Sequence, residues 1–304
     1  MSKHAGTTVT SRPRRWRPPT VGRGVFQVVN VLVLGGFAAI CLLPFLNIIG
    51  SSFATPGELT RRPFVILPET FTLDAYRYIM STPTIFRAMG VSMFVTVVGT
   101  LVSLVLTSLM AYALSKRYLR GRRLLNFLVV FTMLFSGGMI PTFIVVKELG
   151  LIDSLWSLIL PVAINAFNFV IMRSFFQAIP DSLEEAARID GCSDLGVFLR
   201  IVLPLSLASI ATIGLFYAVS YWNTYQSAIL YINSSEKWPM QVLLRQIVIV
   251  ASGLNADANV VDVVPPAQSI KMAVIVVATL PMLILYPVLQ KYFVKGALIG
   301  SVKG

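Results

Sequence analysis

Asp181–Pro204, DSLEEAARIDGCSDLGVFLRIVLP, is a polar segment between two long apolar segments of the chain. It contains five of the thirteen acidic residues. Ala186 and Ala187 favour a helix, and Gly191 suits the positive-φ position that ends one, so the pattern predicts two short helices with a hinge. The first helix would have about nine residues and a length of roughly 13 Å. Because so short a helix is unstable alone in water, we expect it to dock against another protein.

Two residue pairs could begin this first helix. Ser182 and Glu185 have the capping-box spacing, a hydroxyl followed three residues later by a carboxylate. Asp181 and Glu184 have the same spacing and would serve equally well. Either pair would satisfy backbone amides that have no partner within the helix.

The segment resembles the EAA loop of permease subunits in bacterial ABC importers, which reads EAA, three residues, G, nine residues, I, one residue, L and P. The matching residues are Glu185, Ala186, Ala187, Gly191, Ile201, Leu203 and Pro204. In that family the loop is the coupling helix, which docks into the ATPase subunit. The resemblance therefore implies ATPase coupling through Glu184, Glu185, Ala186, Ala187, Asp190, Gly191, Leu203 and Pro204. The alternative is an ordinary amphipathic connector in the cytoplasm.

The composition is that of an integral membrane protein. Of the 304 residues, 56% are hydrophobic and only 12% are charged, which is too apolar for a soluble domain of this size. Six windows of at least nineteen residues lack Asp, Glu, Lys and Arg: 24–57, 88–115, 124–146, 154–172, 201–235 and 272–290. Each can supply the ~20 residues that cross a bilayer, and none alternates as a barrel strand does. We therefore expect an all-α protein with six spans.

The basic residues predict the orientation of these spans. Seventeen of the 25 lie in the N-terminal tail, in the loop at 116–123, in or beside the segment at 181–204, or after the sixth span. The positive-inside rule then places both termini and the 181–204 loop in the cytoplasm. We expect a disordered basic tail at 1–24, a membrane domain at 25–293 and a cytoplasmic C-terminal tail at 294–304.

The net charge of +12 does not indicate nucleic-acid binding. The basic residues are spread over loops beside the spans, where anionic lipid headgroups and the positive-inside bias account for them. The expected partner is thus the lipid bilayer and no nucleic acid.

The sequence indicates no catalytic residue, cofactor or metal site. It lacks a GxxxxGK[ST] loop and a GxSxG motif, and its single histidine, His4, lies in the N-terminal tail. Cys41 falls in the first span and Cys192 in the cytoplasmic loop, so they cannot meet as a disulfide. The spans also lack the ionisable residues of ion-coupled carriers. We therefore expect a chain that is not an enzyme and draws on an external energy source; an ion-driven carrier, a channel or a scaffold is the alternative.

Two polar groups within the spans are candidates for a substrate path. Asn165 and Asn168 are three residues apart and so lie on one face of the expected fourth helix, where they could contact a substrate or bond a neighbouring helix. Tyr221, Trp222, Asn223 and Gln226 combine ring faces with amides, as a sugar site needs. Because Trp and Tyr also mark the membrane interface, an interfacial belt is the alternative.

Interruptions and amphipathic stretches add further expectations. Ser136, Gly137, Gly138 and Pro141 predict a weakened or broken third span, with a proline bend at a close helix crossing as the alternative. The stretch 74–80 is helix-like within an outer cap at 50–87. Apolar residues between 239 and 250 recur at helical spacing, which predicts a helix lying on the outer face.

The resemblance extends to the sugar-importing branch of these permeases, the carbohydrate uptake-1 family that includes the maltose permease. The stretches that carry it are 135–161, 172–191, 221–232 and 289–304. It implies the six-span fold of type I importers (MetI-like), in the bacterial cytoplasmic membrane. It also implies a second homologous permease subunit, two ATPase subunits, an extracytoplasmic solute-binding protein and an oligosaccharide substrate. A permease for another solute, such as a peptide or amino acid, is the alternative.

The last residues form a separate prediction. Gly296, Gly300 and Gly304 recur every four residues and make the end of the chain too flexible for a stable helix of its own. In the resembling sugar permeases this tail can reach between the ATPases, which implies contact through Gly300, Lys303 and Gly304. A frayed, solvated terminus is the alternative.

Overall fold

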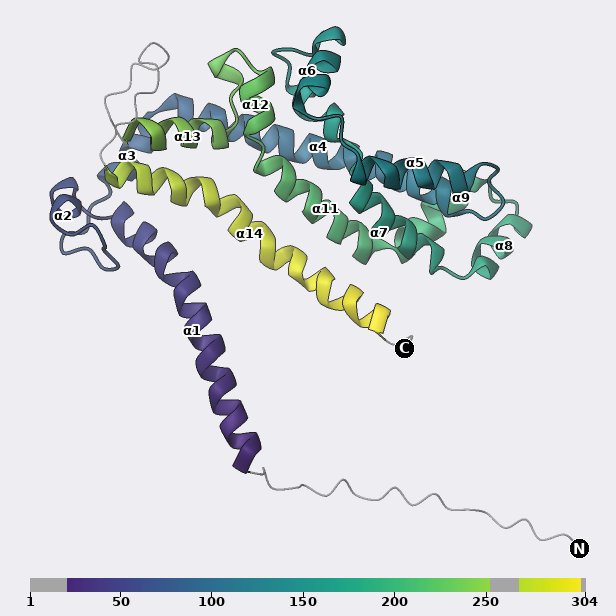
Figure 1. Cartoon of the computed structure of the whole chain (residues 1–304), viewed down its shortest axis with the longest axis horizontal. Helices are drawn as coiled ribbons and strands as arrows, with labels where there is room; N and C mark the ends of the chain where they lie inside the picture. The colour runs from purple at the N-terminus through teal and green to yellow at the C-terminus, as the bar shows by residue number, and fades with distance from the viewer. Residues whose placement is uncertain (1–20, 252–267, 302–304) are drawn as a thin grey trace, which may run out of the picture. The chain divides into compact units, whose positions relative to one another are not determined.

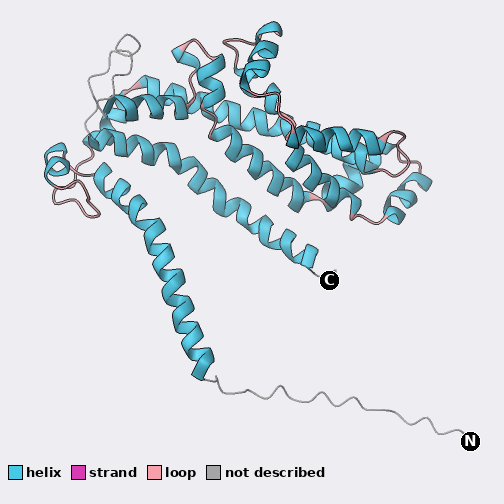
Figure 2. Ribbon diagram, in the orientation of Figure 1, coloured by secondary structure: helices cyan, strands magenta, loops and turns pink. Residues whose placement is uncertain are grey.

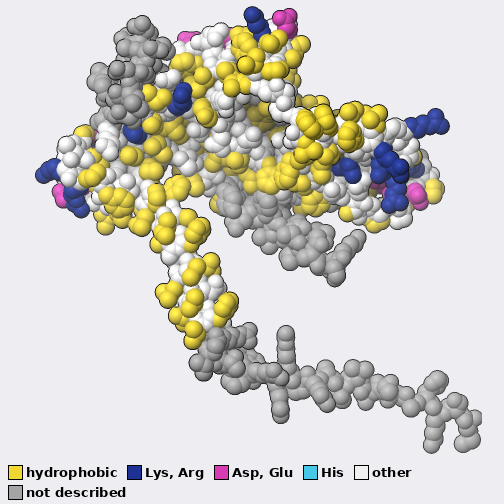
Figure 3. All heavy atoms as spheres, viewed as in Figure 1, with side chains coloured by type: hydrophobic (Ala, Val, Ile, Leu, Met, Phe, Trp, Pro, Cys, Tyr) yellow, Lys and Arg dark blue, Asp and Glu magenta, His cyan; other side chains and the backbone are white. Residues whose placement is uncertain are grey.

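The computed structural model describes residues 21–251 and 268–301, which form helices and connecting loops without a strand (Figures 1 and 2). The chain separates into two units, Met1–Asn47 and Ile48–Gly304. The helix α1 (Val21–Ser52) supplies the described residues of the first unit, and its side chains from Val25 to Leu46 are all exposed. Figure 3 shows the apolar side chains along it. A helix that is apolar on every side is typical of a membrane span.

Three single helices are long and apolar enough to cross a membrane. They are Val25–Ser52 within α1, α4 (Pro83–Ser115) and Gln268–Leu285 within α14 (Gln268–Ser301). Three further candidates are bent pairs of shorter helices, so the described residues hold three to six spans. The pairs are α5 (Arg122–Leu134) with α6 (Met139–Glu148), η1 (Leu155–Leu158) and η2 (Leu160–Val162) with α7 (Ala166–Gln177), and Asp194–Leu205 with α11 (Leu207–Trp222).

The predicted break in the third apolar window is confirmed. The helices α5 and α6 meet at an angle of 117° across residues 135–138. Gly138 has a φ of 85°, a conformation that a residue with a side chain rarely adopts. The backbone therefore turns sharply at this point, and α5 does not continue into α6.

The core of the second unit lies where α4 packs on α11 and α7. Gly99 of α4 allows this close approach, because a Cβ there would lie 2.8 Å from the ring of Tyr221. Next to it, Ser103 Oγ bonds the Tyr221 hydroxyl at 2.8 Å and Thr107 Oγ1 bonds that of Tyr217 at 2.7 Å. Small residues and hydroxyls are the usual means of packing helices where lipid removes the hydrophobic force between them.

The predicted cap and amphipathic helix are both present. The cap contains α2 (Pro56–Arg61) and α3 (Asp74–Ser81), and α13 (Met240–Ala251) packs against α4 and α14. Met240 is fully buried and its amide donates to Ser92 Oγ at 2.8 Å.

The end of α14 differs from the expected flexible tail. The helix continues through Gly296 and Gly300 to Ser301. The reason is that the segment extends a 34-residue helix, so it needs no nucleus of its own. At the other end of the chain, α1 already includes residues 21–24 of the expected disordered tail; residues 1–20 and 302–304 lie outside the described part.

Asp153 joins two loops that are far apart in sequence, one before η1 and one after α12 (Gln226–Tyr231). Its carboxylate accepts from the amides of Asn233 and Ser234 at 3.0 and 2.9 Å and from Lys237 Nζ at 2.7 Å. Its own amide donates to Tyr231 O at 2.7 Å, and its φ is 58°. The sequence contains no signal for this cluster.

These contacts predict how stability depends on pH. The bonds from Lys237 and Ser234 hold the pKa of the Asp153 carboxyl well below its usual range. A carboxyl whose pKa is lower in the folded state stabilises the fold above its unfolded pKa of about 3.9, and the contribution is lost as pH falls below that value. Asn tolerates a positive φ, so Asp153→Asn should lower the unfolding temperature at pH 7 without straining the backbone.

Thermal unfolding of the purified protein at pH 7 and near pH 3 checks this. The difference between the wild type and Asp153→Asn should shrink at the lower pH. Glu236→Gln in the same loop is the matched control, because Glu236 pairs with Arg87 in an exposed ion pair that contributes little. Equal unfolding temperatures for Asp153→Asn and the wild type at pH 7 would rule out the proposed contribution.

Candidate functional site

The predicted short helix is present as α8 (Asp181–Ile189), with nine residues. Gly191, two residues after the last residue of the helix, has a φ of 84°. The Cys192 amide donates to Ala187 O at 2.9 Å and the Gly191 amide to Arg188 O at 3.0 Å. This pair of bonds is the Schellman motif, which satisfies the last carbonyls of a helix. The terminating role of Gly191 is confirmed.

The expected capping pairs are not formed. Pro180 is the residue before α8, and no side chain caps the first turn. Asp181, Ser182 and Glu185 are exposed, whereas Glu184 is buried and turned toward Lys116. The capping prediction failed because Pro180 holds the position before the helix, so Asp181 and Ser182 lie within the first turn. The Glu184 carboxylate, in addition, is taken by Lys116 from another segment.

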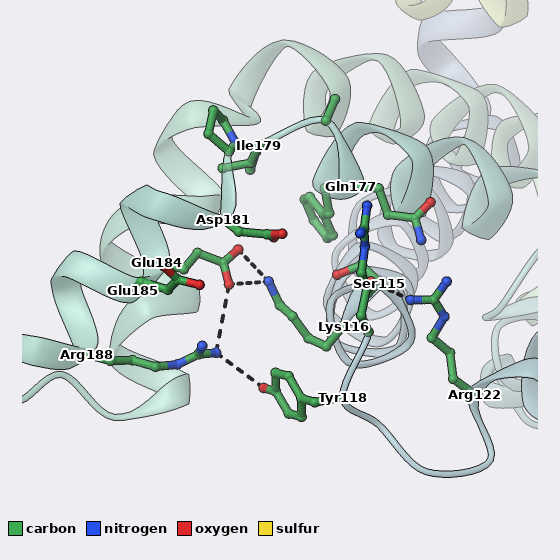
Figure 4. A pocket seen from close by; sticks show the side chains of 14 residues that line it. Ser115, Lys116, Tyr118, Arg122, Gln177, Ile179, Asp181, Glu184, Glu185 and Arg188 are labelled. Atoms are coloured by element: carbon green, nitrogen blue, oxygen red, sulfur yellow. Dashed lines mark hydrogen bonds and ion pairs between the residues drawn. The ribbon is translucent and has the colours of Figure 1, made fainter.

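Lys116 and Glu184 form a buried ion pair between α8 and the residue that follows α4 (Figure 4). The ammonium contacts both carboxylate oxygens, and the side chains are 11% and 5% exposed. Lys116 Nζ also lies 4.3 Å from the centre of the Tyr112 ring, within the range of a cation–π interaction. Glu184 is therefore held within the chain and is not presented to a partner.

Arg188 extends the pair into a network. Its Nη2 lies 3.1 Å from Asp194 Oδ1, 3.9 Å from Glu184 Oε2 and 3.3 Å from the Tyr118 hydroxyl. Asp194 begins α9 (Asp194–Val197), which Ser193 caps through a bond from the Gly196 amide at 3.2 Å. Arg188 thus joins α8, the start of α9 and the loop after α4.

A cavity of about 630 Å³ lies beside this network, between the end of α4 and the start of α8 (Figure 4). Asp181 and Glu185 line it together with the basic residues Arg117 and Arg122. Basic side chains gather at this end of the second unit (Figure 3). The surface can therefore accept polar and charged side chains of a partner.

The remaining coupling residues occupy different places. Glu185, Ala186 and Asp190 are exposed, while Ala187 is packed in the core. Leu203 and Pro204 are not on α8; they lie on α10 (Leu203–Leu205), after the π-helical turn η3 (Phe198–Val202). The segment Asp194–Leu205 meets α11 at 83°, so they stand at a sharp bend.

The structure brings three of the six candidate substrate-path residues together. Asn165, Asn168 and Tyr221 line a cavity of about 320 Å³ with Tyr217 and Ser220. The expectation that both asparagines lie on one helix face needs correction: Asn165 precedes α7, and its Oδ1 accepts from the Asn168 amide at 3.1 Å. This local capping bond accounts for the spacing.

The other three candidates lie outside this cavity. Trp222 is buried, and its Nε1 donates to Ala278 O at 3.2 Å. Asn223 is exposed and donates to Val219 O of its own helix at 2.8 Å. Gln226 is exposed at the start of α12.

Sequence reasoning missed the residues that anchor these sites. The Tyr217 hydroxyl accepts a hydrogen bond from the Asn165 amide at 3.0 Å, and Lys116 forms the ion pair with Glu184. The only signal for Lys116 was its place as the first basic residue after an apolar window.

Of the expected C-terminal contacts, Gly300 lies on α14, while Lys303 and Gly304 are outside the described residues. Among the described residues, no group of His, Cys, Asp and Glu could hold a metal ion.

The sequence matches a known family and close relatives. The family described as the binding-protein-dependent transport system inner membrane component matches residues 103–298. The chain is 66% identical to the polygalacturonan/rhamnogalacturonan transport system permease protein YtcP of Bacillus subtilis, over 88% of this chain and 94% of that protein. It is 61% identical to protein LplC of the same organism, over 92% and 95% of the two chains.

A solved structure shares the fold. It belongs to a bacterial ABC transporter involved in the import of the acidic polysaccharide alginate, with a TM-score of 0.83 and 35% identity, and the match covers 90% of this chain and 98% of that one. The likeness identifies the fold as that of MetI-like ABC permeases. The chain therefore belongs to the family of binding-protein-dependent inner membrane transport components, the permease subunits of ABC transporters, which are not themselves enzymes.

Proposed function

We propose that this permease imports an oligosaccharide by alternating access, driven by separate ATPase subunits that dock on the exposed face of α8. The observation that carries the proposal is the division of α8 into two faces. Glu184 and Ala187 are buried, whereas Glu185 and Ile189 are exposed, Ile189 to 86%. A short helix with one face packed on its own chain and the other face exposed fits the docking of a partner on the exposed face.

The names of the relatives support a sugar substrate. They include permeases for polygalacturonan/rhamnogalacturonan and for arabinooligosaccharides, besides the alginate importer. The cavity at Asn165, Asn168 and Tyr221 combines amides with aromatic rings and is a candidate segment of the sugar path. Its described lining contains no charged side chain, so recognition there would rest on hydroxyl bonding and ring stacking.

The proposed assembly follows the family. This chain would pair with a second, homologous permease, two ATPase subunits and an extracytoplasmic solute-binding protein in the bacterial cytoplasmic membrane. The binding protein would dock on the cap formed by α2 and α3. We further propose that residues 299–304, at and beyond the end of α14, contact the ATPases.

Uptake measurements test the function. Proteoliposomes with the assembled transporter should import oligogalacturonides or arabino-oligosaccharides only with ATP and binding protein, and vanadate should stop the import. Asn168→Leu, which removes the amide from the cavity, should raise KM more than it lowers kcat. Import that survives vanadate and stops when an ion gradient is dissipated would indicate a secondary carrier, and import of peptides alone would indicate another solute class.

Variants of α8 and of the tail test the coupling. Gly191→Val puts a β-branched residue at a φ of 84°, and Glu185→Lys reverses an exposed charge on the docking face. Both should leave the protein inserted in the membrane but weaken ATPase association or separate hydrolysis from uptake. Removing residues 300–304 should lower substrate-stimulated hydrolysis while sparing assembly.

Gly36→Val in α1 is the matched control, because a Cβ at Gly36 meets no atom and its φ is not positive. Wild-type coupling in Glu185→Lys and Gly191→Val would remove α8 from the mechanism, and unchanged stimulation after the deletion would exclude the tail.

Labelling tests the proposed six spans with both termini in the cytoplasm. Cysteines at Gly57 and Ser235, both exposed, should react with an impermeant reagent from outside intact cells. A reporter fused after Gly304 should be active in the cytoplasm. An externally accessible C-terminus would require an odd number of spans and contradict the arrangement.

A further inference from the structure

The buried face of α8 is joined to the end of α4 by an ion pair. Glu184 is 4% exposed, and Lys116 binds both of its carboxylate oxygens. Removing either partner would leave a buried charge unpaired, so the pair resists separation. The other ionic contacts of α8 run through Arg188, which is bound to Asp194 and Tyr118 and is one-third exposed.

The end of α4 is itself rigidly packed. Tyr112, one turn before Lys116, is 8% exposed, and its ring lies 4.9 Å from that of Phe198. Its hydroxyl donates to Asp194 O at 3.4 Å. The end of α4 thus contacts α9 through Tyr112 and α8 through Lys116.

The same helix reaches the candidate sugar cavity. Ser103 and Thr107 bond the hydroxyls of Tyr221 and Tyr217, which both line that cavity. Ser103 lies thirteen residues before Lys116, about 20 Å along a helix. Because close-packed elements move as units, displacement of α8 can reach the cavity along α4.

We propose that Lys116 is a positioning residue, an inference that rests on the proposed function. It transmits displacement of α8, the coupling helix, to α4 and through α4 to the cavity at Asn165. The Lys116 ammonium contacts both Glu184 carboxylate oxygens, and moving α8 away from α4 would leave these charges buried without a partner, which opposes sliding of the two elements. The hydroxyl bonds of Ser103 and Thr107 then transfer the movement of α4 to Tyr221 and Tyr217.

A distance measurement in the assembled transporter tests this inference. Cys41 and Cys192 are replaced by Ser, and spin labels are placed at Val162 of η2 and Ser220 of α11, exposed residues that both line the cavity. Trapping with ATP and vanadate should shift the distance distribution in the wild type. Lys116→Met and Glu184→Gln should each lower the equilibrium constant of this shift by about fivefold or more, the lower end of usual allosteric coupling.

Charge exchange and a neighbouring variant are the controls. The double variant Lys116→Glu with Glu184→Lys should restore the shift, and Arg120→Met, an exposed residue of the same loop, should retain it. Basal ATP hydrolysis is measured in every complex, so that loss of the shift is not loss of assembly. If Lys116→Met or Glu184→Gln fails to assemble, the shift measured in the other single variant decides whether the ion pair is required.

The possible outcomes separate the two proposals. A normal shift in Lys116→Met and Glu184→Gln, an exchange variant that assembles without recovering the shift, or a wild type without a shift would each overturn the inference. A wild type that shows the shift but imports no oligosaccharide would contradict the proposed substrate and leave the role of Lys116 standing.

Discussion

Close packing between α4 and α11 is the interaction on which the second unit depends. A lipid environment gives apolar helices no hydrophobic reason to associate, so contact must come from close backbone approach and from hydrogen bonds. Gly99 provides the approach, and Ser103 and Thr107 provide bonds to two tyrosine hydroxyls. The tyrosines in turn bond Asn165 N and Ile159 O, so the same hydroxyls that hold α4 to α11 also position the broken helix before α7.

Three of the candidate spans are broken helices. Each of the three bent pairs interrupts its backbone bonding, and in a membrane such interruptions persist only where protein or a cavity satisfies the free groups. The break before α7 meets this condition, because Asn165 caps the helix and Tyr217 accepts the Asn165 amide. The candidate sugar cavity lies at this break, as is usual for binding sites of transporters.

Local patterns predicted much of this architecture, and contacts between distant segments account for most of the remainder. The break near Gly138, the helix at 181–189, its end at Gly191 and the amphipathic helix α13 all depend on neighbouring residues, and all were predicted. Neither capping pair formed, because Pro180 precedes the helix and places Asp181 and Ser182 inside its first turn. Lys116, 68 residues before Glu184, also takes the Glu184 carboxylate. The Asp153 cluster could not be predicted from local patterns, because the residues that bond Asp153 follow it by some eighty positions. Only some of the predicted substrate-path residues line the cavity, because sequence spacing does not reveal which neighbour each side chain packs against. Trp222 packs against α14, whereas Tyr221 lines the cavity.

The two adjacent glutamates of α8 show how one short helix can serve two purposes. Successive residues point about 100° apart on a helix, so Glu184 and Glu185 cannot both face the same neighbour. Glu184 turns inward to Lys116, and Glu185 remains exposed. A helix of nine residues does not hold its own structure in water, so α8 owes its position to the packing of Ala187 and to the Lys116 pair. A partner that binds the exposed face therefore acts on a helix whose other face is already fastened to α4.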